Sequence, residues 1–213
     1  YLGSEKLSMS DTIGPALVNG TLTLGYIGLA ETLTALVGHH HGQGEDAQKL
    51  GLEIVAFMRD KMDKAAEKYD LNFSMIATPA EGLSGRFIRM DKREYGIIPG
   101  VTDKAYYTNS NHIPVNFKIS AYEKMRLEGP YCKYSNGGHI SYVEFSASPV
   151  NNLGAVEDIL RHMCACDCGY VGINFPIDYC SNCGYTGIID SDYCPQCSAK
   201  FERRLKRKSC GDN

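Results

Sequence analysis

The sequence predicts an α/β fold that ends in a small cysteine-rich module. Segments with the two-residue periodicity of strands alternate with segments of helical periodicity, and glycine-containing turns join them. This alternation is typical of parallel strands that are connected by helices. The 213 residues provide for one large domain with a small appendage, and 43 % apolar residues suffice for a packed core.

In the first half of the chain, the expected order is strand, glycine turn, helix, long helix, strand. Residues 21–24 alternate and include β-branched side chains, which predicts a strand. Residues 29–37 have one apolar face and are followed by Gly38, a common helix stop signal. The clearest helix is expected at residues 45–69, and a short apolar strand at residues 71–77.

The second half is less regular. Residues 85–150 contain many Gly, Asn, Pro and Tyr in short runs, so long functional loops on a rigid scaffold are expected there. A strand is predicted at residues 140–145, a helix at 151–163 and another strand at 170–175. The three consecutive histidines at 39–41 are interpreted as a loop at a helix end, because adjacent residues do not share one face.

Four cysteines near the C-terminus form the strongest motif. Cys180, Cys183, Cys194 and Cys197 make two C-x2-C pairs with ten residues between them. Such thiolates can converge on one tetrahedral ion, which predicts a structural zinc ribbon with Zn²⁺ as cofactor. Two disulfides are the alternative. The sequence has no secretory apolar region and no long apolar run, which favours a reducing, cytoplasmic location and no membrane partner.

The other cysteines leave more than one interpretation. Cys164, Cys166 and Cys168 alternate, so on a strand all three would lie on one face. An iron–sulfur cluster, a second metal and a redox relay stay open, although their spacing matches none of the common cluster-ligand runs. Cys132 is expected to be an ordinary buried thiol, and Cys210 to be exposed.

Residues 78–81 are the candidate phosphate site. Thr78 is expected at the N-cap of a helix, with Pro79 as its first residue, then Ala80, and Glu81 completing a capping box. A helix that opens directly after a strand presents free N–H groups and a positive dipole end to an anion. In the alternative interpretation Thr78 only caps the helix, but nearby glycines and an arginine favour a ligand.

The charge of the chain and its acid–base residues identify neither a partner nor a reaction. The net charge of −3 and a pI of about 6.1 argue against nucleic acid as the partner. The basic run at residues 203–208 is interpreted as a solvated tail, and a nucleic-acid-binding ribbon is the weaker alternative. Acid–base candidates are present by residue type only, without a spacing that pairs a base with a nucleophile. They are Asp103, Lys104, His112, His139 and Glu144.

Several loop motifs, taken in order, resemble one family: the anaerobic (class III) ribonucleoside-triphosphate reductases, which are glycyl-radical enzymes. The resemblance covers roughly residues 12–198. Its motifs are residues 21–29 with Glu31, 77–83 with Arg86 and Phe87, 99–104, 106–110 with His112, 136–140, 174–178 and the four cysteines.

The resemblance implies an architecture and a reaction. Residues 1–165 would form the second half of a ten-stranded α/β barrel, residues 166–200 the four-cysteine zinc ribbon, and residues 201–213 a basic tail that is a remnant or the start of the glycyl-radical segment. The reaction would reduce ribonucleoside triphosphates to 2′-deoxyribonucleoside triphosphates by glycyl and thiyl radical chemistry. Residues 78–81 would bind the substrate phosphates. A separate S-adenosylmethionine iron–sulfur activase would generate the radical, and the full-length enzyme would be a homodimer.

The sequence departs from the family pattern in three places. It lacks the upstream Met-Gly-Cys-Arg type of loop that carries the thiyl cysteine, and Asn111 stands where an aromatic residue is usual. Gly211 stands about where the radical glycine is expected, without the Val and Tyr that flank it. With Tyr1 as first residue, an incomplete C-terminal fragment that is inactive alone is expected. The alternative function is a non-catalytic zinc-binding module that binds nucleotide or assembles with a separately encoded catalytic half.

Overall fold

The computed structural model describes residues 20–145, 148–175, 177–189 and 191–200. Its helices are α2 (Leu29–Val37), α3 (Glu45–Tyr69), α4 (Glu81–Tyr95), α5 (Ala121–Cys132) and α6 (Leu153–Ala165), with a 3-10 turn, η2 (Pro149–Asn151). Its strands are β1 (Thr21–Tyr26), β2 (Asn72–Ala77), β3 (Ser141–Glu144), β4 (Val171–Asn174), β5 (Asp178–Tyr179) and β6 (Thr186–Gly187). Within these described ranges, no helix is long and apolar enough to cross a membrane.

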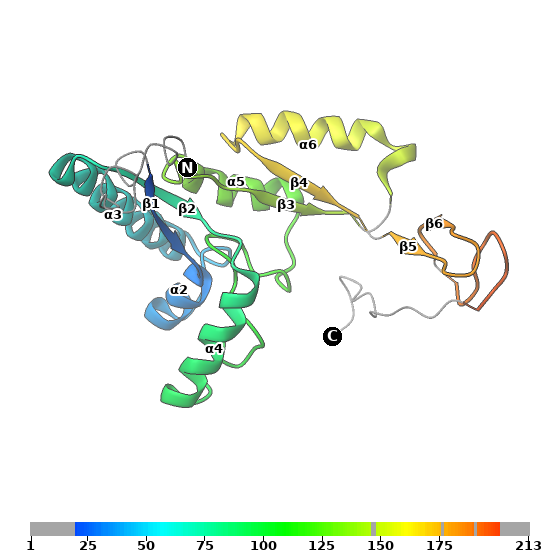
Figure 1. Ribbon diagram of the computed structural model, residues 1–213, viewed down its shortest axis with the longest axis horizontal. Helices are drawn as coiled ribbons and strands as arrows, with labels where there is room; N and C mark the ends of the chain where they lie inside the picture. The colour runs from blue at the N-terminus through cyan, green and yellow to red at the C-terminus, as the bar shows by residue number, and fades with distance from the viewer. Residues whose placement is uncertain (1–19, 146–147, 176, 190, 201–213) are drawn as a thin grey trace, which may run out of the picture.

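The first four strands form parallel pairs, as the sequence predicts. β1 pairs with β2 and β3 pairs with β4, and helices make both connections. On the other edge of β2, the Gly137 N–H donates to the Met75 carbonyl (2.8 Å) and the Ala77 N–H donates to the Gly138 carbonyl (3.0 Å). The segment that leads into β3 therefore extends the first pair, and the strands follow one another in chain order (Figure 1).

The structure has two apolar clusters, and α5 contributes residues to both. The first is made of Leu29, Leu33, Val55, Met75 and Tyr131. The second is made of Met125, Cys132, Val143, Ile159 and Cys168. Because Tyr131 and Cys132 are adjacent on α5 yet belong to different clusters, this helix joins the two strand pairs.

The first two helices have the predicted bounds. α2 begins after Gly28 and ends at Gly38, and both glycines have positive φ (76° and 87°), which non-glycine residues rarely adopt. The Gly38 N–H donates to the Thr34 carbonyl (3.0 Å) and closes the helix. α3 begins with Glu45 and Asp46, whose charges favour a helix N-terminus. Local sequence signals suffice for these elements.

The prediction of long loops over residues 85–150 is wrong for α5 and for most of α4. α5 begins after Ser120, whose hydroxyl accepts a hydrogen bond from the Glu123 N–H (3.2 Å). Pro130 is in the last turn of the helix; its ring provides no N–H for a bond to the preceding turn, and the helix ends two residues later. The remaining segments between these helices and β3 are irregular, as expected.

Glu128 is a fully buried carboxylate on α5 that holds the preceding loop in place. It accepts a hydrogen bond from the Ile113 N–H (2.9 Å). Its oxygens also lie 3.3 Å from His112 Nδ1 and 3.5 Å from Lys124 Nζ. Buried charges are tolerated only with such partners, so this contact ties the loop ending at Ile113 to the helix.

The Glu128 contact makes stability depend on pH. Burial raises the pKa of the Glu128 carboxyl, but the His112 hydrogen bond and the Lys124 charge outweigh burial and leave the pKa below its ordinary 4.5. A carboxyl with a lowered pKa in the folded chain stabilises the fold above its unfolded-state pKa. That stabilisation is lost as pH falls through the folded-state pKa. We expect Glu128→Gln to lower the free energy of unfolding by about 3 kcal/mol at neutral pH.

Urea unfolding of both chains from neutral pH down to about pH 3 checks this expectation, since the difference between them should shrink below about pH 4. Glu123→Gln on the same helix is the matched control, because its carboxylate pairs with Arg126 in solvent and should contribute little. If the difference in free energy of unfolding between the unmodified chain and Glu128→Gln stayed constant over this pH range, Glu128 would not have the lowered pKa that we assign to it.

Candidate functional site

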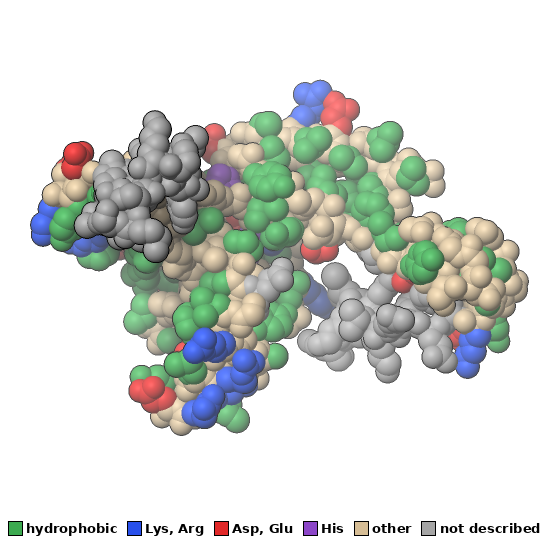
Figure 2. All heavy atoms as spheres, viewed as in Figure 1, with side chains coloured by type: hydrophobic (Ala, Val, Ile, Leu, Met, Phe, Trp, Pro, Cys, Tyr) green, Lys and Arg blue, Asp and Glu red, His purple; other side chains and the backbone are tan. Residues whose placement is uncertain are grey.

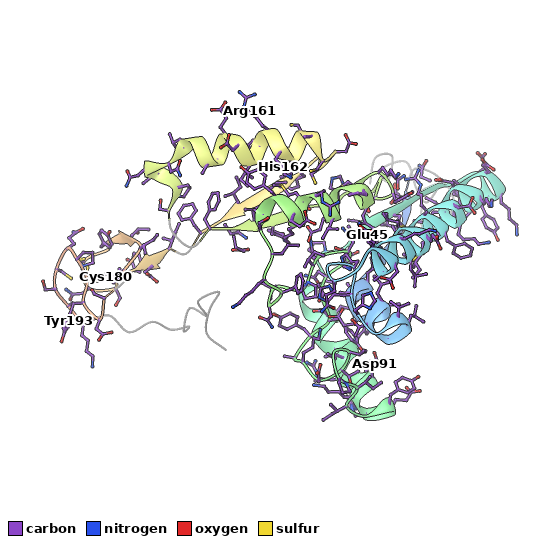
Figure 3. All side chains as sticks on the ribbon, turned by 180° about the vertical axis from the view of Figure 1, so that it is seen from behind. Glu45, Asp91, Arg161, His162, Cys180 and Tyr193 are labelled. Carbon is purple, nitrogen blue, oxygen red and sulfur yellow. The ribbon has the colours of Figure 1, made fainter. Side chains whose placement is uncertain are left out.

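A cavity of about 860 Å³ lies at the carboxyl ends of β1 and β2. Its walls come from the turn that follows β1, the turn that follows β2, and the sides of α2 and α4. Asp91 on α4, labelled in Figure 3, is one of the lining residues. Ligands in open α/β sheets bind beyond the carboxyl ends of parallel strands, so this cavity is the candidate binding site.

The predicted capping box at residues 78–81 is wrong. α4 begins at Glu81, and Ala80 occupies the N-cap position without a side-chain cap. The Thr78 hydroxyl instead donates to the Ile76 carbonyl (3.4 Å). It also packs so closely on Gly25 that a Cβ there would lie 2.1 Å from Thr78 Oγ1. Thr78 and Ala80 line the cavity, whereas Pro79 is exposed. The helix nevertheless begins beside the cavity.

The turn after β2 is held by a residue from another segment. The Ala80 N–H donates to Asn109 Oδ1 (3.3 Å), so the Asn109 side chain, and not a Thr78 cap, satisfies this backbone group. In the first turn of α4, a Cβ placed on Gly82 would meet nothing within 4 Å. The first N–H groups of a helix have no partners within it, and the dipole favours an anion there.

Basic side chains gather over α4 in the space-filling view (Figure 2). Arg86, Arg89 and Arg93 recur at helical spacing, and all three are exposed. Together with the helix dipole, they give the surface around α4 a positive potential. An anionic ligand at the cavity is favoured by this charge.

Glu31 is a buried carboxylate at the cavity wall, with only 2 % of its surface exposed. Its Oε1 accepts hydrogen bonds from Lys104 Nζ (2.9 Å) and from the Thr108 hydroxyl (2.7 Å). The Gly28 N–H donates to the Thr108 carbonyl (2.7 Å). The loop containing Lys104 and Thr108 is therefore fixed to α2 and to the turn after β1.

Tyr107 and Asp91 form a second polar contact in the cavity. The Tyr107 hydroxyl donates to Asp91 Oδ2 (2.6 Å), and both residues line the cavity. Burial raises the pKa of Tyr107 above its ordinary 10.0, and the bond to Asp91 raises it further. The phenol therefore keeps its proton at neutral pH and acts as a hydrogen-bond donor.

The remaining acid–base candidates hold loops together. Asp103 accepts from the Gly100 N–H, and His139 accepts from the Gly169 N–H. Glu144 accepts from the Asn174 side chain, and His112 lies beside Glu128. Lys104, through Glu31, is the candidate that contacts a cavity residue.

The predicted histidine loop and Asn111 meet next to this site. Residues 39–41 lie between α2 and α3, as expected. His41 is buried, and its Nε2 lies 2.8 Å from the Asn111 carbonyl oxygen. Tyr26 donates its hydroxyl to Asn111 Oδ1 (3.0 Å). Asn111, which replaces the aromatic residue expected from the resemblance, therefore has a structural role.

The four C-terminal cysteines converge. The sulfur atoms of Cys180, Cys183, Cys194 and Cys197 lie within 4.8 Å of one another. Cys180 and Cys197 are 3.7 Å apart, as are Cys183 and Cys194. Four sulfurs around a tetrahedral ion with Zn–S distances of about 2.3 Å would be about 3.8 Å apart. A disulfide needs about 2.05 Å, so the cluster fits a metal ion such as zinc and excludes the disulfide alternative.

The segment around this cluster, residues 178–200, is called the cysteine module and lies beyond β4 at one end of the molecule (Figures 1 and 3). β5 and β6 pair antiparallel, and Ile189 packs against Cys180 and Cys194. The Asn182 amide donates to Cys197 Sγ (3.4 Å) and lowers the pKa of this thiol to about 6. Thiolate is the form that binds a metal.

The strand interpretation of the alternating cysteines is wrong. α6 continues through Ala165, so Cys164 is helical, Cys166 follows the helix end, and Cys168 lies in the turn before β4. Among the described residues, these three do not form a metal-ligand group. Cys132 is buried, as predicted. Cys210 and Gly211 lie outside the described residues.

Comparison with known proteins places nearly all of the chain in one family. A family model described as anaerobic ribonucleoside-triphosphate reductase matches residues 1–208, so the match does not include Gly211. The reductase of that name from Escherichia coli (strain K12) is 38 % identical over 219 aligned positions, which cover 97 % of this chain and 30 % of the relative. The reductase of the same name from Enterobacteria phage T4 is 35 % identical, and the alignment covers 97 % of this chain and 33 % of that relative. The chain spans about a third of these relatives' length.

Solved structures agree with this assignment at the level of fold. A structure described as an anaerobic ribonucleotide reductase has a TM-score of 0.68 at 18 % identity, covering 84 % of this chain and 28 % of that chain. The Thermotoga maritima anaerobic ribonucleotide reductase in complex with dATP and CTP has a TM-score of 0.63 at 18 % identity, covering 84 % and 29 %. The chain belongs to the anaerobic ribonucleoside-triphosphate reductase family and is a C-terminal part of such a protein.

Proposed function

We propose that this chain forms the C-terminal half of the catalytic barrel in an enzyme that reduces ribonucleoside triphosphates to 2′-deoxyribonucleoside triphosphates. The observation that carries the proposal is the cavity at the carboxyl ends of β1 and β2, directly beside the start of α4. Family membership supports the reaction. The parallel strands in chain order support the second half of a ten-stranded barrel.

In this proposal the substrate phosphates bind at residues 78–81 and at the first turn of α4. Thr78 and Ala80 line the cavity, and Asn109 holds the turn by its bond to the Ala80 N–H. The N–H groups of the first helical turn then provide the donors that phosphate oxygens require. The exposed arginines of α4 add a favourable field.

The radical steps would need groups outside the described residues. The glycyl radical, made by an S-adenosylmethionine iron–sulfur activase, would supply the oxidising equivalent. Among the described residues that line the cavity there is no cysteine, so the thiyl that removes a ribose hydrogen would come from elsewhere in the full-length homodimeric enzyme. Gly211 is the proposed radical position. Here the chain's own residues bind and orient the substrate.

An anaerobic assay separates this proposal from its alternative. With activase, S-adenosylmethionine, ribonucleoside triphosphate and formate or a thiol reductant, the 213-residue chain should release no deoxynucleotide. The full-length protein that contains these residues should release deoxynucleotide. Turnover by the chain alone would contradict the proposal. Activity only with a separately encoded polypeptide would establish the alternative, a non-catalytic zinc-binding module that assembles with its catalytic half.

The phosphate site is tested by placing a negative charge in the first turn of α4. Gly82→Asp should weaken binding of a ribonucleoside triphosphate about tenfold, which corresponds to about 1.4 kcal/mol. The aspartate fits the open space and favours a helix N-terminus, so the fold should be unharmed. Isothermal titration measures the affinity, with Gly82→Asn as the neutral control. Equal affinity of the two variants would remove the phosphate assignment.

We also propose that the four cysteines bind one structural Zn²⁺. Cys180→Ser should lose the zinc that the unmodified chain holds, as measured by elemental analysis. Proteolysis should then become rapid in residues 178–200, because zinc binding provides the folding free energy of such small modules. Cys164→Ser is the control, since this thiol is exposed and lies outside the cluster. Full zinc content in Cys180→Ser would disprove the ligand assignment.

A further inference from the structure

The cysteine module is built from two knuckles with the same backbone shape. The first, which begins at the labelled Cys180 (Figure 3), covers residues 180–184, and the second covers residues 194–198. In each knuckle the N–H of the fifth residue donates to the carbonyl of the first, at 2.9 Å in both. The fifth residues, Gly184 and Ser198, also share a positive φ, of 76° and 56°. The two backbones are therefore equivalent.

The side chains break this equivalence at the third residue of each knuckle. An amide stands there in both, Asn182 in the first knuckle and Gln196 in the second. Asn182 Nδ2 donates to Cys197 Sγ (3.4 Å), which is a sulfur of the opposite knuckle. Within the described part of the module, Gln196 makes no such bond to a sulfur. The side-chain bond between the knuckles is therefore one-sided.

A hydrogen bond to sulfur matters here because thiolate ligands crowd negative charge around one ion. The four sulfurs lie within 4.8 Å of one another, and four thiolates outweigh the charge of a single Zn²⁺. An N–H donor reduces the charge on the sulfur that accepts it and fixes the position of that sulfur. Asn182 provides this donor to Cys197, so this ligand is held from outside the group of sulfurs.

We propose that Asn182 is a positioning residue that holds Cys197 as a metal ligand and ties the two knuckles together around the ion. The inference rests on the proposed Zn²⁺ site and goes beyond it, because Asn182 is not itself a ligand. Asn182 directly precedes the ligand Cys183 of its own knuckle, so its bond to Cys197 couples the position of one knuckle to that of the other. Without this N–H, the four ligands stay present but Cys197 is held less firmly.

Cobalt(II) bound to the 213-residue chain is the probe, since it occupies tetrahedral thiolate sites and its thiolate-to-metal charge-transfer bands depend on the electrons of the sulfurs. An N–H donor stabilises those electrons. Asn182→Ala should therefore shift these bands to longer wavelength. In competition with a chelator, this variant should bind cobalt(II) about tenfold more weakly, which is the usual effect of losing a hydrogen bond to a metal ligand.

Two further variants separate the N–H group from the rest of the side chain. Asn182→Asp keeps the shape of the side chain without its N–H donor, so it should be impaired at least as much as Asn182→Ala. Gln196→Ala is the matched control, because it removes an amide from the equivalent position of the second knuckle. It should leave the bands and the affinity unchanged. Both positions are exposed, so the variants should fold.

The proposal would be overturned if Asn182→Asp matched the unmodified chain in band position and affinity, because the N–H would then have no role. Equal shifts in Asn182→Ala and Gln196→Ala would overturn it as well, since the effect would not be specific to the bond with Cys197. A different result marks failure of the metal site itself: the unmodified chain would then show no tetrahedral thiolate spectrum with cobalt(II), and the inference about Asn182 would fall with that site.

Discussion

The cavity depends on the buried carboxylate of Glu31. Lys104 and Thr108 satisfy its oxygens, and a buried charge that loses its partners costs several kcal/mol. Thr108 also bonds to the backbone of Gly28, and the next residue, Asn109, bonds to Ala80. One loop therefore holds the turns after both β1 and β2. The first turn of α4 can remain open beside the cavity because this loop, and not a helix cap, positions it.

Much of the fold follows from local sequence signals. α2 and α3 have the predicted bounds because apolar periodicity coincides with glycine or acidic residues at their ends. The four-cysteine cluster follows in the same way, since each C-x2-C spacing brings its own two sulfurs together. The bond between Asn109 and Ala80 joins residues 29 positions apart. No periodicity or spacing reports such a contact, so the organising loop could not be predicted.

Two helix starts show where local patterns fail. At Thr78 the pattern of a capping box is present, but the hydroxyl bonds to the Ile76 carbonyl and packs on Gly25, so the helix starts two residues later than predicted, at Glu81. At Ser120 the same type of signal, a serine followed by Glu123, does cap α5. It is easily overlooked in a segment rich in Gly, Pro and Tyr. Tertiary packing decides which of two similar patterns caps a helix.

The cysteines divide the proposed chemistry between parts of the enzyme. Four of them fit a metal, and Cys132 and Cys168 are buried in the second apolar cluster. None of the described ones lines the cavity. In a radical reductase, a hydrogen-abstracting thiyl must stand next to the bound ribose, because hydrogen transfer requires near contact. Under the proposed function, the turn after β2 would bind the substrate phosphates and the thiyl would come from another part of the protein, so the active centre would form only where the two parts meet.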